Sequence, residues 1–437
     1  MSDNSISVGV LSLHTSKETK AILNAIESLG HEPHWLRRDT IEVSIEDGDI
    51  SLEPDVDIVV NRLLLSRTDK LGELLGLASV YADVVPVLNR PESVFRALHK
   101  FAAATTITEA GLDVPDSYLA LEQGTLDEEA NRFGEQAVYK FTIGTHGEGT
   151  TLVDTSDRLE PLAMDRQSFL QEFIETDEER PFDYRIYVVD GSVVGAMRRT
   201  AREGEFRTNV AEGGEVEDVT DSLPDEVAEM AITVTEEIGL DYSGIDIIER
   251  HGTWYILEVN TTAGFRGLFS ATGVNPAPYI AQAAIERAGG SVSDERIEVL
   301  SRSLDDSIPA CHPGLNRTED LERSAIGYTE RVSVSGTAGT ETVVAKSDTG
   351  AKRTSIDLGL AAEIGAGPIK QSTRVKSGLR QTSKARPVVD VIVGVGGEWH
   401  SVTASIEDRE HMAYPVLLGR DILQKYHVDV TREVEEE

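Results

Sequence analysis

Residues 243–260 read SGIDIIERHGTWYILEVN, with an apolar run on either side of the tripeptide RHG. This pattern predicts two antiparallel strands joined by a short turn. Because side chains alternate along a strand, Glu258 and Asn260 share one face while their apolar neighbours point into a core. Asp246 lies between two isoleucines in the partner strand. A closed hairpin therefore brings three oxygen-bearing side chains to one side.

Three oxygen ligands on one face suit Mg²⁺ that is also held by substrate phosphates. A solvated polar face is the alternative, and the flanking aliphatic residues favour the metal site. A second stretch, VYKFTIGTHGEGT at 138–150, predicts a strand that ends near Lys140 and runs into a loop with Gly144, Gly147 and Gly149. Glycines let backbone N–H groups approach phosphate oxygens, and the lysine meets the same charge.

The composition limits the class of protein. The 437 residues carry a net charge of −36 and a single cysteine, which excludes an intramolecular disulfide. Carboxylates spread along a whole chain are typical of proteins kept soluble at very high salt, and they argue against a nucleic-acid partner. No run is long and apolar enough to span a membrane, so we expect a soluble cytoplasmic protein.

The chain divides into four segments by pattern. Strand and helix signals alternate over 1–95, which predicts a small parallel α/β unit, and hairpins with helices follow over 96–290. Turn-rich sequence over 291–326 predicts a linker, and short strands separated by glycines over 327–437 predict an all-β domain. This last segment has 14 basic and 16 acidic residues, a net charge of −2, which leaves −34 for the rest of the chain.

Three local elements are predicted inside the second segment. They are a helix from about Glu92 to Gly111, a tight turn at Asp190-Gly191, and a helix over 225–240. Nothing in the chain resembles a Walker loop or a G-x-G-x-x-G after the first strand. The lysine, the glycine-rich loop and the oxygen cluster therefore indicate a different nucleotide-binding fold.

These residues resemble the RimK-type ATP-grasp ligases over about residues 6–290. The motifs NRPESVFRALHK, VYKFTIGTHGEG, LQEFIE, DYRIYVV, RRTAREGEFRTNVAEGG, DYSGIDII and LEVNTTAGFRGL occur in the family's order and spacing. The resemblance implies an α/β pre-ATP-grasp unit followed by an α+β ATP-grasp domain. One departure is Ala263-Gly264, where the family commonly has Pro-Gly after the metal strand.

The resemblance also implies ligands, partners and roles. It implies ATP, two Mg²⁺ or Mn²⁺, glutamate and an acidic protein or cofactor acceptor, joined through an acylphosphate that an amine attacks. The nucleotide-binding residues that it implies are Lys100, Lys140, Gly144, Gly147, Gly149, Glu172, Phe173, Asp183, Arg207 and Asn209. The implied metal ligands are Asp246, Glu258 and Asn260. The implied clamps for substrate carboxylates are Arg185 and Arg199, because a guanidinium matches a carboxylate at two points.

The last segment carries two further motifs, AKSDTGAKRTS at 345–355 and DREHMAYPVLLGRDIL at 408–423. Taken alone, the Asp-Thr-Gly at 348–350 predicts a turn. With the second motif it resembles the retropepsin-like β domain, sometimes described as an ATP-dependent zinc protease, that is found fused to or encoded beside RimK-type ligases. Aspartic peptidases need two carboxylates that share a proton. One Asp-Thr-Gly is half of such a site, so we expect a homodimer that pairs Asp348 with its copy.

Two features of this segment allow more than one interpretation. His400, His411 and His427 are scattered, which predicts solvated surface histidines rather than a zinc site. The stretch 364–389 has no acidic residue and six basic ones: Lys370, Arg374, Lys376, Arg380, Lys384 and Arg386. Either it is a solvated loop, or it binds a polyanionic peptide such as a glutamate tail.

Three hypotheses for the whole chain follow. The first is a ligase that adds glutamate or a similar amino acid to a protein C-terminus or a cofactor, with a peptidase-like module that trims or binds the product. The second is a nucleotide sensor that gates a peptidase. The third is a ligase whose C-terminal domain only binds the acceptor.

Overall fold

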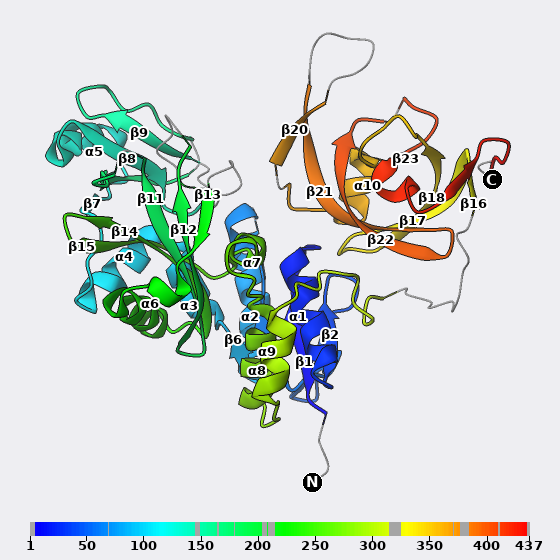
Figure 1. Ribbon diagram of the computed structural model, residues 1–437, viewed down its shortest axis with the longest axis horizontal. Helices are drawn as coiled ribbons and strands as arrows, with labels where there is room; N and C mark the ends of the chain where they lie inside the picture. The colour runs from blue at the N-terminus through cyan, green and yellow to red at the C-terminus, as the bar shows by residue number, and fades with distance from the viewer. Residues whose placement is uncertain are drawn as a thin grey trace. The chain divides into compact units, whose positions relative to one another are not determined.

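The computed structural model describes residues 5–68, 70–144, 149–163, 166–178, 180–202, 208, 215–313, 325–369, 371–375, 384–409 and 411–434. The chain packs as two units (Figure 1). The first unit comprises Met1–Val8, Ala25–Glu32 and Val56–Leu304, and the second comprises Gly9–Asn24, Pro33–Asp55 and Asp305–Glu437. Among the described residues, no helix has the length and apolar character needed to cross a bilayer. The domain boundaries expected at 95, 290 and 326 stay a prediction.

The N-terminal elements confirm a parallel α/β arrangement. Its sheet has the order β2-β1-β5-β6, and β5 pairs with β6 in parallel. The strands are β1 (Ser7–Leu11), β2 (Glu32–Leu36), β5 (Ile58–Asn61) and β6 (Val87–Leu88), and the helices are α1 (Lys17–Ser28) and α2 (Leu71–Val84). β5 is buried along its whole length, as expected for a strand covered on both faces.

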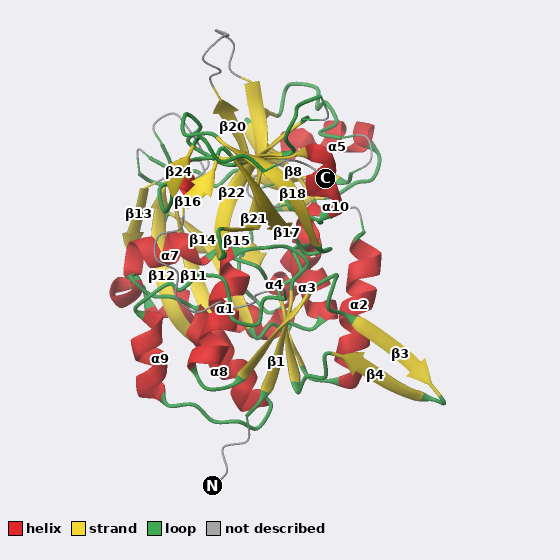
Figure 2. Ribbon diagram, turned by 90° about the vertical axis from the view of Figure 1, so that its right-hand side faces the viewer, coloured by secondary structure: helices red, strands yellow, loops and turns green. Residues whose placement is uncertain are grey.

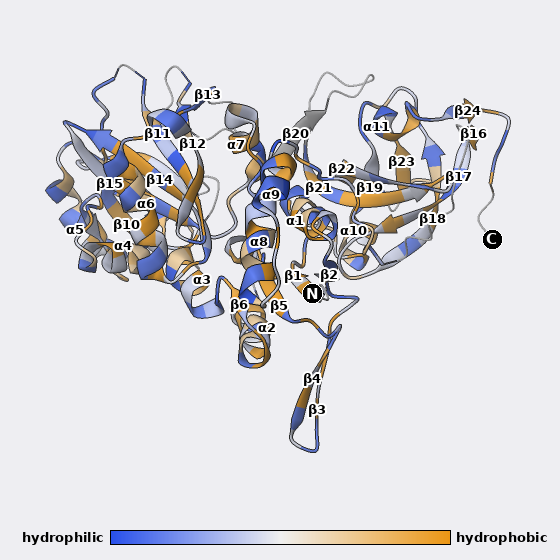
Figure 3. Cartoon of the chain, turned by 60° about the horizontal axis from the view of Figure 1, so that its bottom comes forward, coloured by the Kyte–Doolittle hydropathy of each residue, from blue (hydrophilic) through white to orange (hydrophobic). Residues whose placement is uncertain are grey.

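A separate hairpin, β3 (Glu42–Glu46) and β4 (Asp49–Glu53), was not predicted from the sequence. Figure 2 shows it as a two-stranded ribbon, and Figure 3 shows apolar and polar residues mixed along it. Val43, Ile45 and Ile50 are exposed on one face of the hairpin, while acidic residues and serines alternate with them on the other.

The single helix expected from about Glu92 to Gly111 is two helices, α3 (Pro91–Leu98) and α4 (Lys100–Glu109). His99 separates them with a non-helical ψ of 95°, and its ring accepts a hydrogen bond from the backbone N–H of Ala102 at 3.2 Å, which caps α4. The break makes Lys100 the first residue of α4, and its backbone N–H donates to the carbonyl of Thr142 at 2.8 Å. The prediction of one continuous helix was therefore wrong, and the capped break positions a predicted site residue.

Two antiparallel sheets follow along the chain, with strand orders β7-β10-β8-β9 and β13-β12-β11-β14-β15. The first contains β7 (Ser117–Tyr118), β8 (Gln136–Phe141), β9 (Thr150–Asp154) and β10 (Ser168–Glu172), and α5 (Gln123–Glu129) precedes β8. The second contains β11 (Phe182–Val189), β12 (Ser192–Thr200), β13 (Glu215–Asp218), β14 (Tyr242–Arg250) and β15 (Thr253–Asn260). The tight turn at Asp190-Gly191 is confirmed, with φ of 47° and 70° at its two residues.

Helices accompany the second sheet. They are α6 (Asp225–Ile238), α7 (Phe265–Thr272), α8 (Ala277–Arg287) and α9 (Asp294–Ser301). α6 confirms the helix expected over 225–240 and ends at Gly239 in the left-handed conformation. α9 lies within the stretch that was expected to be a linker.

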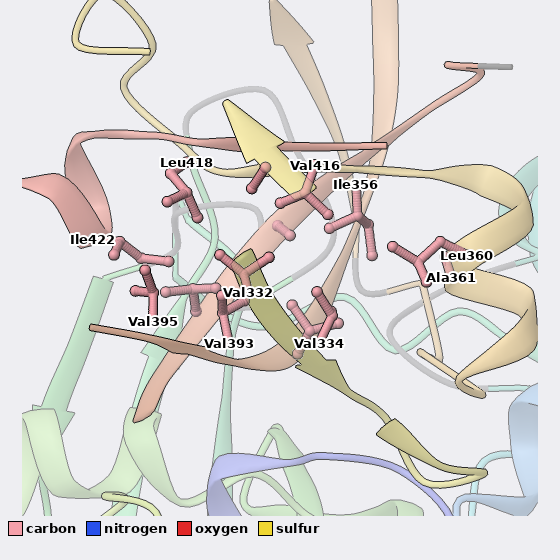
Figure 4. Close-up of a cluster of buried hydrophobic side chains, with 14 of the residues drawn as sticks. Val332, Val334, Ile356, Leu360, Ala361, Val393, Val395, Val416, Leu418 and Ile422 are labelled. Carbon is pink, nitrogen blue, oxygen red and sulfur yellow. The ribbon is translucent and has the colours of Figure 1, made fainter. Parts of the chain in front are cut away.

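The C-terminal segment is a β-barrel, as expected for a retropepsin-like domain. Its sheet has the order β17-β18-β23-β19-β22-β21-β20, and an additional pairing of β17 with β21 closes it. The strands are β17 (Thr329–Ser335), β18 (Thr340–Ser347), β19 (Ser355–Asp357), β20 (Gln371–Val375), β21 (Lys384–Val395), β22 (Glu398–Glu407) and β23 (Val416–Leu418). Two short strands, β16 (Ala325–Gly327) and β24 (His427–Asp429), pair in parallel. The segment also contains helices α10 (Leu358–Glu363) and α11 (Arg420–Leu423). Alternate residues of β17 and β21, such as Val332, Val334 and Val393, point into one core (Figure 4).

Candidate active site

The hairpin of β14 and β15 brings the three predicted metal ligands together. Asp246 faces Glu258 across the two strands, and Gly244 faces Asn260. The pairing register of β14 and β15 shifts directly after Asp246. From the Gly244–Asn260 pair to the Asp246–Glu258 pair the register is regular, so these residues stay on one face. The turn at His251 and Gly252 has φ of 53° and 80°, as expected for a two-residue connection.

Asp246 is buried and shared by two arginines. Arg185, opposite it on β11, donates its Nε and Nη2 to the two carboxylate oxygens, both at 2.6 Å. Arg199 Nη2 lies 3.0 Å from Asp246 Oδ2. Burial raises the pKa of this carboxyl group, but the charges of the two arginines outweigh it and bring the pKa to about 2. The carboxylate is therefore ionised throughout the physiological range.

Asp183 completes this charge cluster. Arg199, its cross-strand neighbour, donates to both carboxylate oxygens at 2.6 and 2.5 Å. The hydroxyl of Thr208 donates to the same carboxylate at 2.6 Å. Asp183 thus orients Arg199, and Arg199 joins it to Asp246 in one network.

Two lysines face the other carboxylate. Lys100 Nζ forms an ion pair with Glu258 Oε1. Lys140, at the end of β8, is 8% exposed, and its ammonium lies 5.3 Å from the ring centroid of Phe169. Burial first, and then the positive charge of Lys100, lower the pKa of Lys140 to about 7, against the opposing effect of Glu258 and Asp246. No carboxylate in the described ranges pairs with this ammonium, so it is positioned to bind an anion.

Asn260 contributes a buried amide, whose oxygen Oδ1 would hold a metal ion and whose nitrogen Nδ2 would donate to an anion. Its Nδ2 is buried and has no hydrogen-bond partner, although buried polar atoms are normally satisfied. Among the residues that the structure describes, no cluster of three or more His, Cys, Asp or Glu could hold a metal ion. Two carboxylates and an amide therefore leave coordination positions to be completed by phosphate oxygens and water, as Mg²⁺ prefers. The residues present fit such an ion.

The loop after β15 is tightly packed despite the Ala263-Gly264 departure. A Cβ at Gly244 would lie 2.6 Å from that of Ala263, so only glycine allows this approach. The hydroxyl of Tyr187 donates to the carbonyl oxygen of Gly264. The alanine therefore sits in a fixed loop over the site face.

The opposite end of the site contains the residues expected around adenine. Glu172 ends β10 and accepts a hydrogen bond from Arg250 Nη1 at 2.8 Å. Phe173 and Arg250 line a cavity of about 560 Å³, together with Thr176, whose buried hydroxyl has no partner. Sequence analysis missed Arg250, because a basic residue beside a turn gives no signal of the residue it will meet.

The predicted phosphate loop is described only in part. Gly149 has a φ of 63°, and a Cβ there would lie 2.0 Å from the Phe141 ring, so the position requires glycine. Gly144 is buried beyond the end of β8. Gly147, Arg207 and Asn209 lie outside the described residues.

The Asp-Thr-Gly of the C-terminal unit forms the turn that its sequence predicts. Asp348 Oδ1 accepts hydrogen bonds from the backbone of Gly350 at 2.9 Å and of Ala351 at 3.2 Å. The Asp348 N–H donates to the carbonyl of Leu418 at 2.9 Å, which ties this turn to the second motif. Both backbone N–H groups bind Oδ1, so Oδ2 takes no part in this turn.

The two motifs of this unit interlock. Thr354 donates its N–H and its hydroxyl to Asp421, at 3.0 and 2.8 Å. A Cβ at Gly419 would lie 2.3 Å from the carbonyl carbon of Arg353, so the strands approach through a glycine. Asp421 therefore holds the segment after the Asp-Thr-Gly turn against the second motif.

The three scattered histidines have different environments. His411 and His427 are exposed, as expected. His400 is buried, and its Nε2 lies 2.5 Å from the hydroxyl of Tyr426. Burial, with a smaller effect of Lys425, lowers the pKa of His400 to about 4. The prediction of a solvated histidine was wrong at this position, because β22 turns the ring inward.

The fold and the site together define an ATP-grasp protein. Among solved structures, the chain is similar to the ATP-grasp ligase PsnB in complex with a phosphomimetic variant of its minimal precursor, Mg and ADP. The TM-score is 0.52 at 20% identity, covering 65% of this chain and 99% of that one. At this identity the similarity shows the fold alone.

Sequence comparison identifies the family. Residues 97–284 match the RimK-like ATP-grasp domain. The chain is 30% identical over 308 residues to the tetrahydromethanopterin:alpha-L-glutamate ligase of Methanosarcina acetivorans, covering 60% of this chain and 93% of that protein. It is 29% identical over 284 residues to the probable alpha-L-glutamate ligase 2 of Hahella chejuensis, covering 61% and 90%. The chain belongs to the RimK-like ATP-grasp ligases, which form C–N bonds.

A second match covers the C-terminal unit. Residues 360–436 match the retropepsin-like aspartic endopeptidase RimB. This confirms the predicted retropepsin-like domain. Asp348 lies before the matched segment.

Proposed function

We propose that this protein is an ATP-dependent carboxylate–amine ligase that adds glutamate, or a similar amino acid, to the C-terminus of a protein or to a cofactor. The observation that carries the proposal is the cross-strand cluster of Asp246, Glu258 and Asn260 surrounded by Lys100 and Lys140. The glutamate ligases among its relatives support the choice of amino acid, and Mg and ADP in the complex of PsnB support the choice of cofactors.

The reaction follows from the chemistry of the site. The γ-phosphoryl group of ATP moves to an oxygen of the acceptor carboxylate, which releases ADP and leaves an acylphosphate. The amine of glutamate then attacks the carbonyl carbon, phosphate leaves, and the amine loses a proton as the amide bond forms. Phosphoryl transfer needs positioning and neutralisation of charge rather than a covalent protein intermediate.

The residues of the site divide this work. Lys100 and Lys140 hold the phosphates. Protonated Lys140 compensates negative charge of a phosphate that would otherwise be buried without a counter-ion. Asp246, Glu258 and Asn260 would hold two Mg²⁺ or Mn²⁺. Bound there, the ions would neutralise the phosphate oxygens as the phosphoryl group moves.

The arginines supply the remaining positive charge. Carboxylates on neighbouring strands fix the orientation of the guanidinium groups of Arg185 and Arg199. Their Nε and Nη2 atoms already bind Asp246 and Asp183, so each would contact the acceptor carboxylate or the transferred phosphate through Nη1.

The test is ADP formation by the purified protein with ATP, Mg²⁺, glutamate and a panel of acidic peptides and cofactors. Product formation should depend on both glutamate and acceptor, and mass spectrometry of a cell extract should show ladders spaced by one glutamate. ADP release without any amine, or peptide cleavage that nucleotide alone controls, would instead support the nucleotide sensor. Glu258→Ala should abolish turnover in the ligase.

For the C-terminal unit we propose an aspartic-peptidase-like site that trims or binds the product and is completed by a second copy of the chain. One Asp348 per chain supports the pairing of two chains. Pepstatin-sensitive cleavage of polyglutamyl peptide, lost in Asp348→Asn and second-order in protein at low concentration, is the expected result. Binding without cleavage, unchanged in Asp348→Asn, would leave this unit an acceptor-binding module.

A further inference from the structure

A buried arginine near the ligase site has no anionic partner among the described residues. Arg62 follows β5 and is 2% exposed. Within the described residues no carboxylate pairs with it, and its Nε is enclosed without a hydrogen-bond partner. An arginine keeps its charge in proteins, and a buried charge without a counter-ion is strongly unfavourable. Such a position calls for an anion that the described part of the chain does not provide.

The contacts of Arg62 among the described residues are with neutral groups, and Asp241, a carboxylate that also acts on Tyr242, pairs with Arg287 instead. The guanidinium of Arg62 lies 5.3 Å from the ring centroid of Phe265. The hydroxyl of Tyr242 is hydrogen-bonded to Arg62 and donates to the carbonyl of Asn61 at 2.5 Å. The guanidinium therefore contacts an aromatic ring and a hydroxyl. Neither of them carries the negative charge that would neutralise it.

The start of α7 lies beside this arginine. Phe265 is its first residue, and Gly264 at the N-cap offers no side chain to accept from the first backbone N–H groups. Those groups carry partial positive charge at a helix N-terminus. A buried arginine and an uncapped helix start thus share Phe265, and both favour an anion.

This position belongs to the face that carries the metal ligands. Tyr242, Gly244 and Asp246 alternate on β14 and share one face. Four residues of strand separate the tyrosine from the aspartate, which is about 13 Å along the sheet. The loop from Asn260 to Phe265 connects the two ends. A small molecule lying along this face can reach both of them.

We propose that Arg62 binds a carboxylate of the incoming amino acid, so that its amine is directed toward the acylphosphate at Asp246 and Glu258. This inference rests on the proposed ligase function and assigns its amino-acid site. Free glutamate has two carboxylates that keep their charge throughout the reaction, so it suits a permanent cation. An enclosed guanidinium also suits a small free amino acid better than the chain of a protein acceptor.

The experiment compares Arg62→Met and Arg62→Lys with the wild type in steady-state ligation. Loss of a charge-assisted hydrogen bond should raise KM for glutamate by about 10- to 100-fold in Arg62→Met, with partial rescue in Arg62→Lys. KM for ATP should change by less than about threefold. The control is Arg132→Met, which removes another arginine placed over an aromatic ring, 4.8 Å from the centroid of Tyr118.

Substrate analogues make the test specific. Glutamine and glutamate α-amide each lack one carboxylate, and one of them should bind the wild type weakly. In Arg62→Met this analogue and glutamate should bind equally, because Arg62 and the missing carboxylate are the two partners of one interaction. Additive losses, or an unchanged KM for glutamate, would overturn the inference.

Binding measurements separate this inference from the proposed function. Calorimetry of glutamate binding in the presence of a non-hydrolysable ATP analogue needs no turnover. Glutamate binding that Arg62→Lys and Arg62→Met leave intact refutes the inference while the ligase function stands. Absence of glutamate-dependent ADP formation with every acceptor, together with glutamate binding that is lost in Arg62→Met and weakened in Arg62→Lys, refutes the function and keeps the amino-acid site. If Arg62→Met does not fold, Arg62→Lys alone decides, since lysine keeps the charge and loses the fork geometry.

Discussion

Nucleotide binding should depend on pH through Lys140. Burial and the nearby Lys100 lower the pKa of Lys140 to about 7 in the nucleotide-free protein. Burial removes water from the Lys140 ammonium, and a bound triphosphate places negative charge beside it. The lysine is therefore protonated in the complex. Binding above pH 7 therefore takes up a proton.

The magnitude follows from the fraction of protein that is already protonated. With a pKa of about 7, half of the molecules are protonated at pH 7 and about one in a hundred at pH 9. The apparent Kd is the intrinsic value divided by the competent fraction. It should therefore rise by about 50-fold between these pH values, with uptake of nearly one proton at pH 9. Phosphate has its last pKa near 6 and is already fully ionised across most of this range.

The assay is titration calorimetry with a non-hydrolysable ATP analogue and Mg²⁺ in two buffers of different ionisation enthalpy. The difference between the observed enthalpies gives the number of protons taken up. Lys140→Arg is the matched variant, because arginine stays protonated, and its Kd should be nearly flat from pH 7 to 9. A flat Kd with no proton uptake in the wild type would refute the reasoning.

Three further outcomes are expected. Glu258→Gln should keep the fold, as judged by thermal unfolding, but lower kcat by at least 100-fold, since it removes one charged metal ligand. Asp246→Ala leaves two buried guanidinium groups with one fewer partner and should lower the free energy of unfolding by about 3–5 kcal/mol in urea titrations. A smaller loss would mean that the arginines re-pair or reach water. Gly419→Ala places a methyl group 2.3 Å from backbone and should destabilise the barrel by about 3 kcal/mol or more, whereas Gly76→Ala, in open space on a helix, should not.

The sequence predicted the β14–β15 hairpin because alternation, a Gly-containing turn and three polar residues of one parity all agree there. It could not predict what those polar residues contact. The pairs of Arg185 with Asp246 and of Arg199 with Asp183 depend on the register of three strands, which is set by packing across the sheet.

Two errors have the same cause. No glycine or proline marks the break between α3 and α4, and it depends on the ring of His99 capping the next helix. His400 looked like a surface histidine, yet its strand turns it toward Tyr426 in the barrel. Local pattern gives the type of element, whereas tertiary contacts decide where it stops and which of its polar residues are buried.

The charges of the nucleotide-free site imply an order of events. Asp246 is ionised and already bound by two arginines, and Glu258 is paired with Lys100. A metal ion alone must displace these cations, which leaves buried positive charge without a partner. Nucleotide phosphates remove that obstacle. When the metal binds Asp246 and Glu258, the phosphates become the new anionic partners of the displaced lysine and arginines. Metal and nucleotide should therefore bind as a unit, each with much lower affinity in the absence of the other.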